Sequence, residues 1–79
     1  MKLTYDPKYN IAYIRLKSKR GKVRTVCVSD ELNVDLAPDG SVYGIELLNA
    51  NAQLSADRKM SLTVENKASG ESRKLAISV

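Results

Sequence analysis

The segment "NVDLAPDGSVYGIEL", residues 33–47, decides the fold, because two alternating apolar runs flank a turn. Asp39-Gly40 is a strong hairpin signal, since both central residues of a type I′ turn need positive φ. A two-residue loop there places apolar side chains opposite each other on one face. The predicted pairs are Leu36 with Tyr43, Val34 with Ile45, and Leu32 with Leu47.

The same pattern constrains the loop length. A three-residue loop would slip the register by one and set Leu32 beside Glu46, which would expose a whole apolar face. The pattern therefore argues against it. Pro38 lacks an N–H, which a two-residue loop would need in its closing pair. A four-residue loop, 37–40, with Pro38 at the second turn position, keeps the same facing. The sequence does not distinguish between the two-residue and the four-residue loop, and both remain as alternatives.

The rest of the chain also reads as strands, with alternating or β-branched runs between turn residues. Spacing after the hairpin favours one short helix over 49–56, with Asn49 as a candidate N-cap. In the last two runs we expect Leu62 and Val64 to point inward, and Leu75, Ile77 and Val79 to share a face. The fold class is α+β, an antiparallel sheet of five or more strands built from hairpins. The expected strands are 2–6, 11–16, 23–28, 32–36, 41–47, 60–66 and 73–79.

Composition indicates a small folded protein. The 79 residues suffice for one domain, 1–79, with 43% hydrophobic and 28% charged residues. Neither a signal peptide nor a membrane-spanning run is expected. The lone Cys27 cannot form an internal disulfide, and we expect a small strand residue in a reducing cytoplasm. The net charge of +4 favours acidic partners without identifying one.

The hairpin register places Asn33, Asp35, Gly44 and Glu46 on the face opposite the apolar pairs. Asp35 and Glu46 could share acid and base duties only if their environments separated their pKa values. Nothing in the pattern indicates that, so we expect a solvated or partner-binding face and no enzyme. Gly44 leaves a bare patch between the acids and marks a bulge or a close backbone approach.

Metal and nucleotide chemistry find little support. Asp6, Asp35, Asp39 and Glu46 offer oxygen ligands, but their spacing matches no EF-hand. The chain contains no histidine, which makes a zinc site and a Ser-His or Cys-His dyad unsupported. We therefore expect no metal and no cofactor.

A basic cluster lies between the second and third expected strands, and we place it at one hairpin tip. It could contact nucleic-acid phosphates or an acidic protein surface, or it could be a solvated loop that protects sheet edges. No aromatic residue interleaves with these charges, so stacking on single strands is not indicated. The cluster consists of Lys17, Lys19, Arg20, Lys22 and Arg24.

Two blocks of the chain resemble a known family. "YDPKYNIAYIRL" at 5–16 and "VDLAPDGSVYGIELLNA" at 34–50 are similar to the small prokaryotic proteins grouped as domain of unknown function 2283. The resemblance covers 1–54, while the expected hairpin at 60–79 lies outside it. Lys8 and Asn10 stand where the family often has acids, which weakens acid or metal chemistry at the first turn. The matching residues are Tyr5, Asp6, Tyr13, Ile14, Asp35, Gly40, Gly44, Ile45, Glu46 and Ala50.

The resemblance implies no assigned activity, and it implies an antitoxin-like role by analogy, because members often sit beside small toxin-like proteins. We therefore expect a non-enzymatic protein-interaction module that docks a sheet edge or one face onto a small, toxin-like partner. The candidate binding residues are Asp6, Asp35, Gly44 and Glu46. The alternative is a nucleic-acid-associated protein that uses the basic 17–24 loop. A homodimer is also expected, since a small core and open sheet edges favour self-association.

Overall fold

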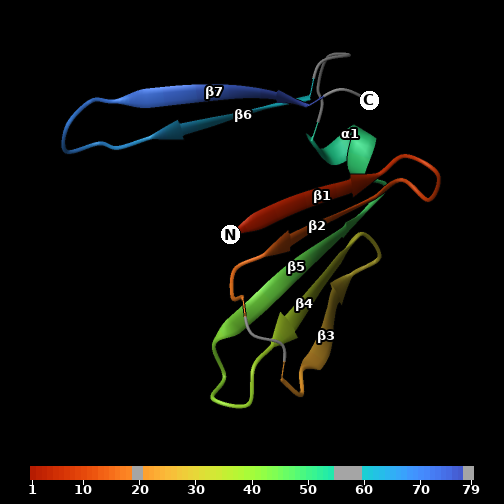
Figure 1. Cartoon of the computed structure of the whole chain (residues 1–79). Coiled ribbons are helices and arrows are strands. Elements are labelled where there is room, and N and C mark those ends of the chain that lie inside the picture. Colours follow the sequence, from red (N-terminus) through yellow and green to blue (C-terminus); the bar gives the residue numbers. More distant parts are fainter. Residues whose placement is uncertain (19–20, 55–59, 78–79) are drawn as a thin grey trace.

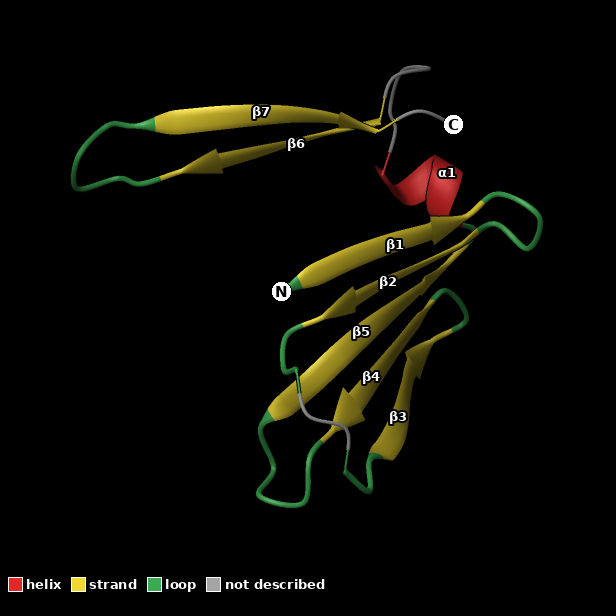
Figure 2. Ribbon diagram, viewed as in Figure 1, coloured by secondary structure: helices red, strands yellow, loops and turns green. Residues whose placement is uncertain are grey.

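A computed structural model of the chain describes residues 1–18, 21–54 and 60–77 (Figure 1). Five strands form one antiparallel sheet in the order β1-β2-β5-β4-β3, and β6 and β7 form a separate hairpin (Figure 2). One short helix, α1, follows the large sheet, which confirms the α+β class. The elements are β1 (Lys2–Asp6), β2 (Ile11–Arg15), β3 (Arg24–Ser29), β4 (Leu32–Leu36), β5 (Val42–Leu48), α1 (Ala50–Leu54), β6 (Met60–Glu65) and β7 (Ser72–Ile77).

The strand order corrects the predicted position of the basic cluster. β2 pairs with β5, and β3 pairs with β4, so β2 and β3 are not neighbours and form no hairpin. Leu16, which follows β2, lies against β5 of the β4–β5 hairpin, where its N–H donates to the Tyr43 carbonyl at 2.9 Å. The hairpin prediction failed because β5, which comes later in the chain, inserts beside β2.

The β4–β5 loop differs from both predicted lengths. Ala37 pairs with Ser41 through an N–H···O bond of 2.8 Å, which leaves the three residues Pro38, Asp39 and Gly40 in the loop. The Gly40 N–H donates to the Ala37 carbonyl at 2.9 Å, and Gly40 has φ of +87°. This is a three-residue hairpin loop with Gly in the left-handed position, and Pro38 occupies the second turn position as expected.

A β-bulge removes the objection to that loop. The register shifts between Asp35 and Leu36, so Leu36 pairs with Val42 and Tyr43 becomes the extra residue. Beyond the bulge, the predicted pairs Val34–Ile45 and Leu32–Leu47 are both present. The predicted Leu36–Tyr43 pair is wrong. The three-residue loop shifts the register by one residue, and the bulge compensates for this shift, so the two apolar pairs are kept.

Asn49 occupies the predicted N-cap position of helix α1, since its carbonyl accepts from the Ala52 and Gln53 N–H groups, but the first N–H groups of the helix are capped by the first turn of the chain. Asn10 has φ of +56°, a left-handed conformation that asparagine tolerates. Its carbonyl accepts from the Ala50 N–H at 3.0 Å, and its side-chain oxygen accepts from the Asn51 N–H at 2.8 Å. Asn49 has φ of +52°, and its side-chain oxygen accepts from Asn10 Nδ2 instead. Residues 55 and 56 of the predicted helix lie outside the described residues.

The large sheet has two different faces. The register places aliphatic residues and one tyrosine together on one side, which we call the apolar face: Leu3, Tyr5, Ala12, Ile14, Val26, Leu32, Val34, Leu36, Ile45 and Leu47. Only its Ala12 is buried, at 0% exposure, together with Ala50 of α1. The apolar face is therefore covered by α1 at one end and is otherwise half-buried or exposed.

The C-terminal hairpin stands apart from the large sheet (Figure 1). Leu62 pairs with Leu75, and Val64 pairs with Arg73, so Leu62, Val64 and Leu75 share one side of the hairpin. Val64 is 53% exposed and Leu75 is 57% exposed. The prediction that Val64 points inward is wrong, because no layer of the described chain packs over it. Val79, predicted to share this side, lies outside the described residues.

Candidate functional site

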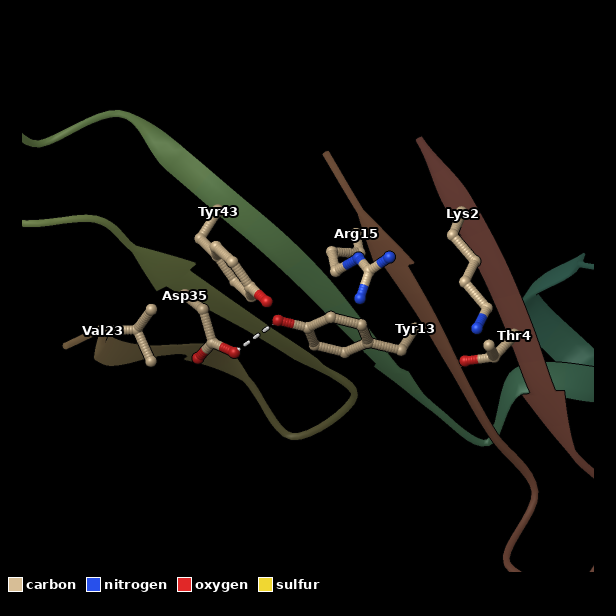
Figure 3. Close-up of a pocket in the computed structure, with 7 residues that line it drawn as sticks. All are labelled: Lys2, Thr4, Tyr13, Arg15, Val23, Asp35 and Tyr43. Carbon is tan, nitrogen blue, oxygen red and sulfur yellow. Dashed lines mark hydrogen bonds between the residues drawn. The ribbon is translucent and has the colours of Figure 1, made fainter. Parts of the chain in front are cut away.

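The side of the large sheet opposite the apolar face, which we call the polar face, carries an open hollow of about 320 Å³. Its floor is formed by side chains from β1, β2, β4 and β5 (Figure 3). The prediction that Asp35 and Gly44 face away from the apolar pairs agrees with this arrangement. The lining residues are Lys2, Thr4, Tyr13, Arg15, Val23, Asp35 and Tyr43.

Asp35 lies at the centre of a hydrogen-bond network. The Tyr13 hydroxyl donates to Asp35 Oδ2 at 2.7 Å, and Thr25 Oγ1 donates to Asp35 Oδ1 at 2.6 Å. Asp35 on β4 is thus bonded from strands on both sides, since Tyr13 belongs to β2 and Thr25 to β3. Each carboxylate oxygen already accepts a hydrogen bond, which ties β2, β4 and β3 together across the face.

Tyr13 reaches Asp35 because Gly44 leaves space for its ring. A Cβ atom at Gly44 would lie 2.5 Å from Tyr13 Cζ and 2.7 Å from Cε1. The bare patch expected at Gly44 is therefore filled by a neighbouring aromatic ring. Burial and the hydrogen bond donated to Asp35 raise the pKa of Tyr13 above its usual range. Tyr13 is consequently a neutral donor at physiological pH.

Glu46 is held separately from Asp35. It pairs with Asn33 across β4 and β5, and Asn33 Nδ2 donates to Glu46 Oε1 at 2.9 Å. Asp35 pairs instead with Gly44. Both acids accept hydrogen bonds from neutral side chains and lie on one face, and no hydrogen bond within the described residues joins them. The arrangement fits acids that organise a sheet surface.

Two cations share the hollow with Asp35. Lys2 and Arg15 are register partners on β1 and β2, and Figure 3 shows both side chains beside Tyr13. The polar face is therefore of mixed charge. Asp6, another predicted binding residue, accepts from the Lys8 N–H at 2.9 Å within the first turn and does not line this hollow.

The described basic residues lie near the end of the β4–β5 hairpin and at the start of β3. Lys17 contacts Ser41 Oγ and lies 3.8 Å from Asp39, whose pKa is lowered by hydrogen bonds from Ser41. Lys17 and Lys22 together line a second hollow with Pro38 and Asp39. Arg24 is exposed at the start of β3. Lys19 and Arg20 lie outside the described residues.

Strand β3 forms an open edge of the sheet. It pairs with β4 on one side, and all six of its residues are exposed. A bulge between Cys27 and Ser29 interrupts the regular ladder near its end. Cys27 is an exposed free thiol on this strand, as expected of a small strand residue. The regular part of β3 presents backbone groups that a further strand could pair with.

Sequence reasoning missed several residues of the polar face. Tyr13, Thr25 and Tyr43 were not singled out as site residues, although Gly44 carried the signal that an aromatic neighbour fills its space. Tyr43, 7% exposed, was assigned to the apolar side, and the bulge turns it toward Tyr13. The residues around Tyr43 give no sequence signal that predicts this bulge.

The described residues contain neither a cluster suited to a metal ion nor a helix suited to crossing a membrane. Within the part of the chain that the structure describes, no group of three or more Asp, Glu, Cys or His side chains could hold a metal ion. No helix in the described ranges has the length and apolar character needed to cross a membrane.

Comparison with known proteins places the chain in a family. Searches of curated proteins and of solved structures give no significant match. A family model described as a protein of unknown function, DUF2283, matches residues 2–51. That match covers β1 to β5 and the start of α1, including the Tyr13, Asp35 and Gly44 network. The chain therefore belongs to the DUF2283 family, whose function is not assigned.

Proposed function

We propose that this protein is a non-enzymatic protein-interaction module that binds an extended segment of a partner protein at the edge of β3. The observation that carries the proposal is the exposure of all six β3 residues at an open sheet edge. An added strand supplies main-chain hydrogen bonds to such an edge and gains specificity from alternate side chains. Soluble proteins usually protect long edges, so an open one is informative.

The state of the acids supports binding rather than catalysis. Asp35 and Glu46 each accept hydrogen bonds from neutral donors and stabilise the sheet beside the edge. A general acid or base has to reach a substrate proton, whereas these oxygens are engaged with Tyr13, Thr25 and Asn33. By analogy with the family resemblance, the partner would be a small toxin-like protein and this chain its antitoxin-like counterpart.

The test is affinity capture of a partner from a lysate of the source cell, with nuclease, at low and high salt. We expect one stoichiometric protein that stays bound at high salt. Val26→Pro and Cys27→Pro are compared because consecutive strand residues alternate in the direction of their N–H groups. One of the two removes an outward N–H, and that variant should fold and lose the partner. Val26→Ala and Cys27→Ala keep the N–H and serve as controls.

Three outcomes would contradict the proposal. Folded proline variants that bind the partner as well as their alanine controls would exclude β3 as the docking edge. Recovery of nucleic acid that is lost with salt would favour the alternative based on the basic residues, because phosphate binding weakens steeply with salt. Recovery of this chain alone would exclude a stable protein partner under those conditions.

A further inference from the structure

We infer that a second copy of this chain covers the apolar face, so that the protein is a homodimer with two sheets packed apolar face to apolar face. This inference concerns a different surface from the proposed β3 edge and does not depend on it. It rests on the burial of the apolar face, on the total surface area and on the distribution of charge.

The burial pattern shows a sheet that lacks a second layer. Ile14 and Ile45 are register partners on the neighbouring strands β2 and β5, and both stay half-buried. Val34, on β4 beside Ile45, is also half-buried. Domains are built from packed layers, because a sheet with one apolar face has to bury that face against another element. In the described chain, α1 buries only the end of the face at Ala12.

The surface area supports a missing layer of substantial size. The chain exposes 6334 Å². A compact monomer of 8.7 kDa would expose about 4,700 Å². The difference is about 1,600 Å² per chain. Standard interfaces hide about 800 Å² per partner, and obligate homodimers hide more. The excess area therefore falls in the range that an obligate homodimer conceals.

The charge distribution favours a second copy over a different protein. A two-fold interface brings the same patch from both chains together, so the patch has to be self-complementary. Among the described strand residues of the large sheet, the register places one charged side chain, Arg24, on the apolar face, and it lies at the rim. Two copies can therefore pack there without like charges in the centre, and sheets stack at about 10 Å when aliphatic side chains interdigitate.

The C-terminal hairpin carries a second uncovered apolar surface. One of its sides carries Leu62, Val64 and Leu75, with Arg73 opposite Val64 nearer the hairpin turn, and this side is also without a covering layer in the described chain. One chain thus carries two apolar surfaces that do not cover each other. A second copy supplies a partner for both surfaces at once, which a partner that matches only the sheet would not do.

The test is sedimentation equilibrium of the purified full chain over a concentration series, with circular dichroism to verify folding. We expect a dimer at micromolar concentration. Val26→Lys places a charge on the apolar face and is matched by Cys27→Lys, its neighbour on the polar side of the same strand. We expect Val26→Lys to weaken dimerisation by about 100-fold or more, because each dimer carries the change twice. We expect Cys27→Lys to change it less than about threefold.

The hairpin has its own matched pair. Leu75→Lys changes the apolar side, and Ala76→Lys adds the same group to the opposite side. If Val26→Lys fails to fold, this pair keeps the inference testable, with Leu75→Lys expected to weaken the dimer and Ala76→Lys to leave it intact. A wild-type monomer at about 100 μM would overturn the inference, as would folded Val26→Lys or Leu75→Lys proteins that dimerise like wild type. These results would leave capture at the β3 edge unaffected.

Discussion

The two faces of the large sheet satisfy their residues in different ways. The polar face is complete within one chain, since Tyr13, Thr25 and Asn33 supply hydrogen bonds to Asp35 and Glu46. The apolar face is incomplete, since α1 covers only the end at Ala12. The difference teaches that polar groups in this fold are paired across the strands of the sheet, whereas the aliphatic groups have no second layer within the described residues.

The largest effect on this comparison is expected at Gly44. Gly44→Ala would place a Cβ against the Tyr13 ring and displace the hydroxyl from Asp35. Overpacking of this kind costs about 2 kcal/mol in the free energy of unfolding. Gly21→Ala is the matched control, because nothing lies within 4 Å of a Cβ there. Urea denaturation should show a large loss for Gly44→Ala and little change for Gly21→Ala. Equal stability of the two variants would exclude the close approach of Tyr13.

The next effect concerns the junction at the covered end of the apolar face. Asn10→Ala removes the acceptor for the Asn51 N–H and puts Ala at φ of +56°. Loss of the capping bond and backbone strain together cost about 2 kcal/mol. Asn10→Gly also removes the capping bond, but glycine adopts the positive φ without strain. It should therefore lower the free energy of unfolding by about 1 kcal/mol, which is the contribution of the side-chain hydrogen bond alone. Thermal or urea unfolding measures both. A glycine variant as unstable as the alanine variant would show that backbone strain contributes nothing.

The regions that sequence reasoning predicted well are those governed by alternation. The bounds of β1 and β4 match the prediction, and the described ends of β2, β3, β5, β6 and β7 differ from it by one residue. The last two residues predicted for β7 lie outside the described residues. The pairs Val34–Ile45 and Leu32–Leu47 follow from the need to keep aliphatic side chains on one face. The left-handed Asn10 and the turn over 7–10 also follow from local residue preferences.

Most of the failures share a different cause, which is distance along the chain. β5 inserts between β2 and β4, so the 17–23 connection is a crossover rather than a hairpin. Asn10 caps α1 from a turn forty residues away, and local spacing could only nominate Asn49. The Tyr13 to Asp35 bond also joins strands that are separated in sequence. The bulge at Tyr43 reconciles the three-residue loop with the pairing of Val34 with Ile45. Without the bulge, that loop length would shift the β4–β5 register by one residue.

Tyr13→Phe tests the completeness of the polar face at a single atom. It removes the hydrogen bond to Asp35 Oδ2 while the bond from Thr25 stays, so we expect a loss of about 1 kcal/mol near pH 7. The stability difference between wild type and Tyr13→Phe depends on pH, because the pKa of Tyr13 is higher in the folded chain than in the unfolded one. Tyr13 therefore ionises more readily after unfolding, and alkaline pH favours the unfolded state. Wild-type stability should therefore fall as the pH rises above 10.0, the ordinary tyrosine value, and Tyr13→Phe should lack that component.

Urea unfolding of both proteins at neutral and alkaline pH measures this difference. The advantage of wild type over Tyr13→Phe should shrink above the ordinary tyrosine pKa. Tyr43→Phe is a suitable control, because no hydrogen bond from its hydroxyl is seen in the described residues. An advantage of wild type that stays constant with pH would mean that Tyr13 ionises as readily in the folded chain as in the unfolded one.

The smallest effect is expected at the end of the sheet, where the chain contributes charge but little burial. Lys17 lies 3.8 Å from Asp39, and the side chains are 41% and 71% exposed. An exposed ion pair of this kind contributes about 0.5 kcal/mol or less, and salt screens it. We expect Lys17→Ala to lower the free energy of unfolding by no more than that at low salt, and to match wild type at high salt. A loss comparable to that of Gly44→Ala would show that the crossover, through Lys17, stabilises the β4–β5 loop as strongly as the polar face stabilises the sheet.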